Sequence, residues 1–250
     1  MTSQITSQLK SRIEINKKFG TVDLDEWIFS KFDIKDSYAV LDLGCGTGNH
    51  IIKLAELFSN ANYYGIDISN SSIIEAKKKA EQKNLKINFI CGDAFDVSKL
   101  ENNFFDLIIS LYALYYIKDT QKILSVLKAR LKKDGKIAVM APYRGNNEEW
   151  YSILRTFMKI PDDIESVADN FMDNEVLPFA RSNFKNVKIY NFVNKVLVPS
   201  YDDLKKYWVS NIYHKEEFDT DFEKKASEFF KKNKYFAITK IGMMVIMSIK

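Results

Sequence analysis

Cysteine is scarce in this sequence, which contains only two cysteines, Cys45 and Cys91, among its 250 residues. So few cysteines exclude the disulfide framework of a small secreted protein and the ligand sets of cysteine-based zinc sites. Both lie at the ends of runs of strand-forming residues, so we interpret them as small packing residues. We expect no metal site.

Arginine is also sparse, since only five of the 37 basic residues are arginines, at positions 12, 130, 144, 155 and 181. Proteins that bind nucleic acid usually concentrate basic residues in a stripe and use arginine for bidentate contacts to phosphates and bases. The net charge of +4 comes instead from lysines spread along the whole chain, a pattern typical of solvated helix faces. We therefore expect no nucleic-acid partner.

Long apolar runs are absent as well. The longest run dominated by apolar residues, Leu107 to Ile117, is far shorter than a membrane span, and the first ten residues lack the apolar core of a signal peptide. A chain of 250 residues with 46% hydrophobic residues can bury the core of one α/β domain. We expect a soluble, cytoplasmic monomer or homodimer with no membrane partner, folded as a single domain over residues 1–250.

The sequence does contain a regular alternation of strand-like and helix-like segments from residue 38 to residue 141. Such alternation predicts a parallel sheet with helices on both faces. Two helical patterns precede it, at 4–19 and 23–32, and Asp134-Gly135 is a suitable helix stop near its end. The predicted strands are 38–43, 62–67, 87–91, 105–110 and 135–141, and the predicted helices between them are 49–58, 70–83 and 119–131.

The pattern changes after residue 142, and all four prolines lie from that position onward. The apolar spacing predicts helices at 147–159 and 163–182, a strand at 184–198, two helices within 201–230 and a last strand at 238–249.

The glycines are unevenly placed, because three of the nine fall within residues 44–48, directly after a strand-forming run. Glycine tolerates positive φ and lets a ligand approach the main chain, and a helix beginning at Asn49 would aim its free N–H groups at that ligand. The turn therefore suits a nucleotide-like molecule. The third glycine is Gly48 where a dinucleotide fingerprint needs position 49, and no Gly-Lys-Ser/Thr of a P-loop follows.

The acidic residue and glycines of Asp42-Leu-Gly-Cys-Gly-Thr-Gly48 resemble motif I of the class I S-adenosylmethionine (SAM)-dependent methyltransferases, which are Rossmann-like enzymes. Asp67 ends the next predicted strand about twenty residues later, where a ribose diol needs a carboxylate. Gly92-Asp93-Ala94 resembles the segment that meets the adenine. Residues 105–117 resemble the fourth strand and the loop that faces the reacting methyl group.

This resemblance implies a seven-stranded, mostly parallel sheet with its last strand antiparallel and helices on both faces. It implies SAM as methyl donor and S-adenosylhomocysteine (SAH) as product. Around a core of residues 37–142, residues 1–36 would form N-terminal helices, and 143–183 and 199–233 would be helical insertions or a lid. The cofactor ligands implied are Asp42, Gly44, Cys45, Gly46, Gly48, Asp67, Ile68, Asp93, Ala94 and Ser110.

The loop after the fourth strand helps to define the methyl acceptor. It lacks the Asn/Asp-Pro-Pro-aromatic motif of enzymes that methylate base amines, and no cysteine stands beside proline as in pyrimidine C5 methylases. The small-molecule branch often has two histidines where this chain has Tyr115-Tyr116. His214 and Tyr115 are the candidates for a general base, and Arg12, Tyr112, Tyr143, Arg144 and Trp208 are candidates for the acceptor wall. We interpret Asp106 and His50 as structural.

We therefore expect a metal-independent SAM-dependent methyltransferase that acts on an O, N or C atom of a small molecule. Two alternatives stay open. One is a methyltransferase that acts on RNA or on a peptide or protein, and the other is a SAM-binding module without transfer activity. A nicotinamide dehydrogenase ranks below both, because Asn49 displaces the glycine that such an enzyme needs.

Overall fold

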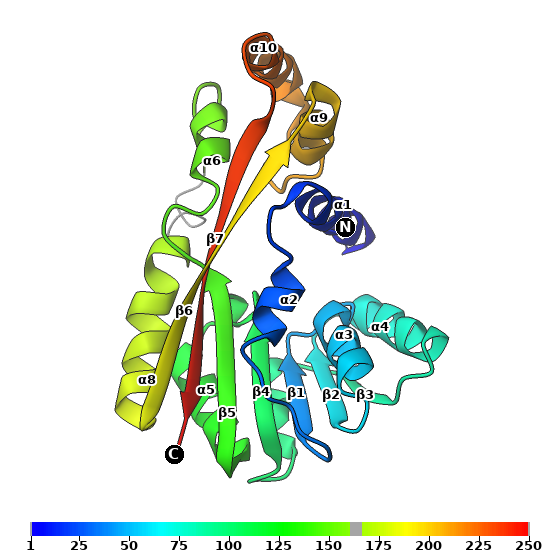
Figure 1. Ribbon diagram of the computed structural model, residues 1–250, viewed down its shortest axis with the longest axis vertical. Coiled ribbons are helices and arrows are strands. Elements are labelled where there is room, and N and C mark those ends of the chain that lie inside the picture. Colours follow the sequence, from blue (N-terminus) through cyan, green and yellow to red (C-terminus); the bar gives the residue numbers. More distant parts are fainter. Residues whose placement is uncertain (1, 161–166, 250) are drawn as a thin grey trace.

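The computed structural model describes residues 2–160 and 167–249, and only the backbone over residues 2–10. The described residues build a seven-stranded sheet in the order β3-β2-β1-β4-β5-β7-β6 (Figure 1). Strands β1 to β5 pair in parallel, while β7 runs antiparallel to both of its neighbours. The predicted fold class is thereby confirmed. The strands are β1 Ala39–Leu43, β2 Asn62–Asp67, β3 Ile87–Cys91, β4 Phe105–Leu111, β5 Leu131–Pro142, β6 Asn186–Val198 and β7 Phe236–Ser248.

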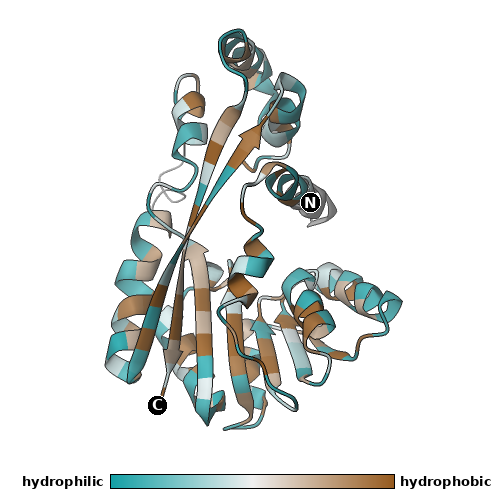
Figure 2. Cartoon of the chain, in the orientation of Figure 1, coloured by the Kyte–Doolittle hydropathy of each residue, from teal (hydrophilic) through white to brown (hydrophobic). Residues whose placement is uncertain are grey.

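Helices cover both faces of this sheet because successive strand residues point to opposite sides. Leu41 of β1 packs in a cluster with residues of α5 and α8, whereas its neighbour Val40 packs with residues of α2, α3 and α4. The central strands β1 and β4 are accordingly rich in buried apolar residues, and the hydropathy colours show apolar residues along them (Figure 2). These helices are α2 Leu24–Phe29, α3 Asn49–Leu57, α4 Asn70–Gln82, α5 Thr120–Arg130 and α8 Leu177–Asn183.

Strands β6 and β7 are each 13 residues long and continue past the carboxyl end of β5, where Pro142 pairs with Gly242. Four helices pack around their far ends (Figure 1): α1 Thr2–Phe19, α6 Glu148–Leu154, α9 Tyr201–Val209 and α10 Asp219–Phe230. We call these helices and the strand ends that they cover the cap. Aromatic side chains form its centre, with the indole of Trp208 stacked on Phe222 and Trp150 beside both. The cap thus has a hydrophobic core of its own.

The chain between α1 and α2 is tied to β6. Gly20 forms an isolated bridge with Val196, and the N–H of Thr21 donates to the carbonyl of Lys195 at 3.0 Å. The buried amide of Asn194 accepts from the N–H of Val22 at 3.0 Å. The N-terminal segment therefore lies against the same strand that carries the cap.

The insertion predicted at 143–183 is divided between two places. Helix α6 belongs to the cap, but the π-helical turn η3 (Phe171–Val176) and α8 pack against the sheet next to α5. Their side chains Met172 and Val176 are fully buried there. Residues 161–166, part of the predicted helix 163–182, lie outside the described residues. Residues 143–183 thus contribute both to the cap, through α6, and to the cover of the sheet, through η3 and α8, and their role as a lid stays a prediction.

The expected helix stop at Asp134-Gly135 was wrong. Helix α5 ends at Arg130, and β5 begins at Leu131, which pairs with Phe105. A Cβ on Gly135 would lie 2.8 Å from the carbonyl oxygen of Phe105, so this glycine allows β5 to approach β4 closely. None of the helices in the described ranges is long and apolar enough to serve as a membrane span.

Candidate active site

The glycine turn follows β1 at the carboxyl edge of the sheet. Gly44, Gly46 and Gly48 have φ values of 78°, 52° and 75°, which side-chain-bearing residues rarely adopt. The N–H groups of Gly44 and Cys45 donate to the carbonyl of Ile66 at 2.8 and 3.0 Å and fix the turn to β2. A Cβ on Gly46 would meet nothing within 4 Å. The main chain at Gly46 is therefore open to a ligand.

Asp67 ends β2 beside this turn. Its Oδ2 accepts a hydrogen bond from the N–H of Gly46 and its Oδ1 one from the N–H of Ser69, both at 2.8 Å. Each carboxylate oxygen has a second lone pair, so the group can still accept from two hydroxyls. The sequence prediction of a ribose ligand suits this position, because the carboxylate is already oriented by the glycine turn.

The end of β3 adds a second carboxylate to the same edge, since Asp67 pairs with Cys91 in the sheet. Asp93 is the N-cap residue of the short helix η1 (Ala94–Lys99), and its Oδ1 accepts a hydrogen bond from the N–H of Phe95 at 2.8 Å. Ile68, which follows Asp67 in the chain, is 73% exposed. An exposed apolar side chain next to a carboxylate suits an adenosine, whose base is flat and whose ribose is polar.

Asp42 is the buried acid of the site. It is 2% exposed, and its Oδ2 has no hydrogen-bond partner among the described residues. Burial, opposed by the charge of His50 and assisted by that of Asp67, raises the pKa of Asp42 to about 7. An unpaired carboxylate below the glycine turn suits a ligand that carries positive charge, as the sulfonium and ammonium groups of SAM do. The residues present therefore fit SAM.

Two predicted cofactor residues, Cys45 and Ser110, have side chains that point into the protein. Ser110 is fully buried, and its hydroxyl donates to the carbonyl of Leu43 at 3.0 Å, which joins the ends of β4 and β1. Cys45 is 7% exposed, and burial raises the pKa of its thiol. Asp106 joins the opposite ends of the same strands, since its Oδ2 accepts from the N–H of Ala39 and from Lys132, both at 2.8 Å. Its structural interpretation is confirmed.

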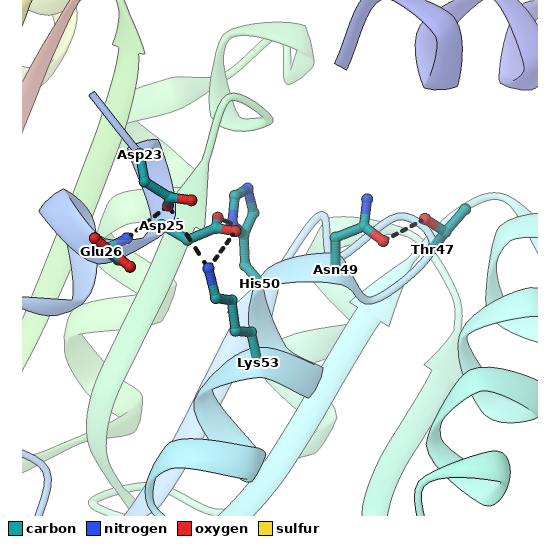
Figure 3. Close-up of polar contacts among 7 residues, drawn as sticks. All are labelled: Asp23, Asp25, Glu26, Thr47, Asn49, His50 and Lys53. Carbon is teal, nitrogen blue, oxygen red and sulfur yellow. Dashed lines mark hydrogen bonds and ion pairs between the residues drawn. The ribbon is translucent and has the colours of Figure 1, made fainter. Parts of the chain in front are cut away.

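His50 links the first turn of α3 to α2 (Figure 3). Its Nδ1 lies 2.9 Å from Oδ1 of Asp25, whose Oδ2 pairs with Lys53 at 3.1 Å. Burial would raise the pKa of Asp25, but its hydrogen bonds to His50 and Lys53 outweigh burial and lower the pKa to about 2. The pKa of His50 is raised, because the bond to Asp25 outweighs its own burial. This ion pair holds α2 against the helix that follows the glycine turn.

The loop after β4 brings two tyrosines to the carboxyl edge. Tyr112 has φ 57°, and its N–H donates to the carbonyl of Met140 at 2.8 Å. The ring of Tyr115 lies 4.4 Å from that of Tyr116 and 5.9 Å from that of Phe171. Burial raises the pKa of both Tyr112 and Tyr115. At neutral pH both hydroxyls are protonated and can orient an acceptor by hydrogen bonding.

A cavity of about 130 Å³ lies between the cap helices and β7. Of the predicted acceptor residues, Arg12 lines it. Lys240 of β7, which the sequence analysis missed, lines it too and donates to Oδ1 of Asn147 and to the hydroxyl of Tyr207, both at 2.6 Å. Its signal in the sequence is a lysine inside the mostly apolar run 236–247. The polar side chains that argue for a ligand here are Arg12, Asn16, Asn147, Trp150, Tyr207 and Lys240.

Three other predicted acceptor residues, Tyr143, Arg144 and Trp208, are paired with acids elsewhere. None of these three, nor Tyr112, is among the described residues that line the cavity. The hydroxyl of Tyr143 donates to Asp173 at 3.2 Å, and Arg144 forms an ion pair with the same carboxylate at 2.7 Å. Asp219 receives the indole N–H of Trp208 at 2.7 Å and lies 3.0 Å from Nε2 of His214. Through these contacts with Asp219, both Trp208 and His214 stabilise the packing of α9 and the loop after it on α10.

Comparison with known protein families gives one match over this region. The family described as "Methyltransferase domain" matches residues 34–183. Among curated proteins, the ubiquinone biosynthesis O-methyltransferase of Coxiella burnetii is 30% identical over 146 residues, 57% of this chain and 61% of the relative. Phosphoethanolamine N-methyltransferase 2 of Caenorhabditis elegans is 30% identical over 132 residues, 52% of this chain and 30% of the relative. The matches thus span less than two thirds of these relatives.

Solved structures share the fold at low sequence identity. A putative methyltransferase of Bacillus halodurans aligns with 89% of this chain and 97% of its own, with a TM-score of 0.62 and 12% identity. Phosphoethanolamine N-methyltransferase 2 of Haemonchus contortus, in complex with phosphomonomethylethanolamine and SAH, aligns with 96% of this chain and 53% of its own, with a TM-score of 0.54 and 16% identity. At these identities the likeness concerns the fold alone.

Proposed function

Because this chain belongs to the methyltransferase domain family, whose cofactor is SAM, we propose that it transfers the SAM methyl group to an O, N or C atom of a small molecule. One observation carries the proposal. The carboxylate of Asp67 is hydrogen-bonded to the N–H of Gly46, at the point where the glycine turn is open to a ligand.

The chemistry of such a transfer asks little of the protein's side chains. Bound SAM supplies an activated methyl group on a sulfonium, so the protein has to align two molecules and exclude water. Asp67 and Asp93 would hold the ribose and the adenine, and Asp42 would face the positive charge. Alignment alone is worth roughly 7–11 kcal/mol of barrier. No metal is required by this scheme.

The cap supports a small acceptor over RNA or a protein. The cavity beside Arg12 is bounded by three cap helices and β7, which leaves space for a small molecule. The relatives named for ubiquinone biosynthesis and for phosphoethanolamine also act, by their names, on small molecules. His214 and Tyr115 stay the candidates for a general base, and Tyr115 lies in the loop after β4 that is expected to face the methyl group.

Calorimetry with SAH tests the proposal. We expect the Asp67→Ala variant to bind SAH about 1–3 kcal/mol more weakly than the wild type, because a charged hydrogen-bond acceptor is lost. Asp106→Ala is the matched control, since this carboxylate lies at the opposite end of the sheet and should leave the affinity unchanged. Absence of SAH binding by the wild type, or equal affinities for the wild type and Asp67→Ala, would overturn the assignment.

A further inference from the structure

The residues that line the cavity in the cap carry most of the unpaired buried polar atoms found among the described residues. In the ranges that the structure describes, four buried side-chain nitrogen or oxygen atoms have no hydrogen-bond partner. Three of them belong to residues that line this cavity: Nε of Arg12, Oδ1 of Asn16 and Nε1 of Trp150. An unpaired buried polar atom costs about 1–3 kcal/mol, so three at one place indicate that a ligand pairs with them.

The cavity also carries positive charge without an acid to balance it. Arg12 and Lys240 both line it, and none of its described lining residues is acidic. Glu149, an acid whose charge acts on Lys240, is engaged by the N–H of Thr239 at 3.0 Å and by the hydroxyl of the same residue. Burial and the charge of Arg12, partly offset by Glu149, lower the pKa of Lys240 to about 7. An anion would relieve this repulsion and satisfy both cations.

The size and place of the cavity suit one end of a methyl acceptor. A cavity of about 150 Å³ can hold a benzene ring, so one of about 130 Å³ has room for a small anionic group and a few further atoms. The charge of Arg12 acts on the hydroxyl of Tyr115 in the loop after β4. Gly242, two residues after Lys240, is so close to Tyr112 that a Cβ there would lie 2.8 Å from its hydroxyl. The cavity is therefore next to the loop that is expected to face the methyl group.

We propose that this cavity binds an anionic group of the methyl acceptor, a carboxylate or a phosphate, through Arg12 and Lys240. The indole N–H of Trp150 is a third donor to the same anion. The inference rests on the proposed methyl transfer and narrows its substrate class to small molecules with an acid group. Asn147 and Tyr207, which accept hydrogen bonds from Lys240, hold its ammonium group in the cavity.

A direct binding experiment tests this without turnover. The chain has three tryptophans, so an NMR spectrum of the 15N-labelled protein shows three indole N–H signals, and the loss of one in Trp150→Phe identifies that of Trp150. Acetate, acetamide and inorganic phosphate are titrated separately at constant ionic strength. We expect acetate or phosphate to shift the Trp150 signal saturably, with a Kd in roughly the millimolar range, and acetamide to leave it in place. The tighter of the two anions shows which acid group the acceptor carries.

Variants of the lining residues show which side chains bind the anion. Arg12→Gln should weaken anion binding at least tenfold, and Arg12→Lys should restore part of it because the charge is kept. Arg144→Gln is the matched control, since this arginine pairs with Asp173 outside the cavity. A circular dichroism spectrum shows whether each variant is folded. If Arg12→Gln does not fold, Lys240→Met provides a second test of the anion site.

The outcomes separate this inference from the proposed function. SAH binding with no saturable shift of Trp150 would overturn the anion site and leave methyl transfer standing. Equal shifts by acetate and acetamide, or unchanged anion affinity in Arg12→Gln, would also overturn it. An anion-dependent shift in a protein that does not bind SAH would instead support the site and refute the proposed function.

Discussion

Replacing Asp42 by asparagine should stabilise the free protein at alkaline pH and weaken its hold on the cofactor. The side chain is 2% exposed, and its Oδ2 has no partner among the described residues. Asparagine has nearly the same shape but no charge, so it removes the cost of burying a carboxylate and leaves the packing of β1 intact.

The magnitude follows from the pKa of Asp42, which burial raises from 3.8 to about 7. Between these two values the folded protein binds more protons than the unfolded chain, so the wild-type free energy of unfolding falls as the pH rises through this window. A tenfold change in proton affinity corresponds to about 1.4 kcal/mol, which gives up to about 4 kcal/mol above pH 7. The free energy of unfolding of Asp42→Asn does not fall in this way. The variant should therefore exceed the wild type in stability by little at pH 4 and by the full amount near pH 8.

Urea unfolding followed by tryptophan fluorescence measures the effect at pH 4.5, 6 and 8. The control is Asp106→Asn, whose carboxylate has two partners and whose loss should destabilise the protein at pH 8. If Asp42→Asn and the wild type differ by the same free energy at all three pH values, the carboxylate does not titrate as described and the reasoning fails. SAH calorimetry completes the test. The stabilised variant should bind SAH about 1–3 kcal/mol more weakly, because it lacks the carboxylate that faces the positive charge of the ligand's ammonium group.

Two further changes test the turn and the cap. Gly46→Val should abolish SAH binding while the protein stays folded, because the new side chain enters open space, at a backbone cost of about 1–2 kcal/mol for the positive φ; SAH affinity within twofold of wild type by calorimetry would contradict it. His214→Ala should lower the melting temperature by loosening α9 from α10 and leave SAH affinity unchanged. Loss of methyl transfer at an unchanged melting temperature would instead identify His214 as a base.

The arrangement of the glycine turn and the two carboxylates at one edge of the sheet could be predicted from the sequence, because each of these parts is local. The glycine turn, Asp67 and Asp93 stand directly at the ends of strands, and parallel strands bring their carboxyl ends to one edge of a sheet. The sequence did not reveal the direction in which each side chain points. Ser110 was predicted as a cofactor ligand, yet its hydroxyl donates a hydrogen bond to the carbonyl of Leu43 in the neighbouring strand β1.

The cap could not be predicted in the same way, because its contacts join segments far apart in the chain. Arg12 and Lys240 are more than 200 residues apart, and only the long β6–β7 pair and α1 bring them together. Trp208 and His214 have the composition of a binding wall, but Asp219 accepts a hydrogen bond from one and pairs with the other. An aromatic residue in a helix gives no signal that separates a pocket wall from a packed core.

The attachment of residues 20–22 to β6 has a consequence for how the two ligands affect each other. Residues 20–22 join α1, whose Arg12 lines the cavity of the cap, to α2, whose Asp25 contacts the helix that follows the glycine turn. The residues between Arg12 and Asp25 therefore connect the cavity of the cap to the helix after the glycine turn. If a bound cofactor and a bound acceptor each held this segment in place, thermodynamic linkage would make each favour the binding of the other by the same factor.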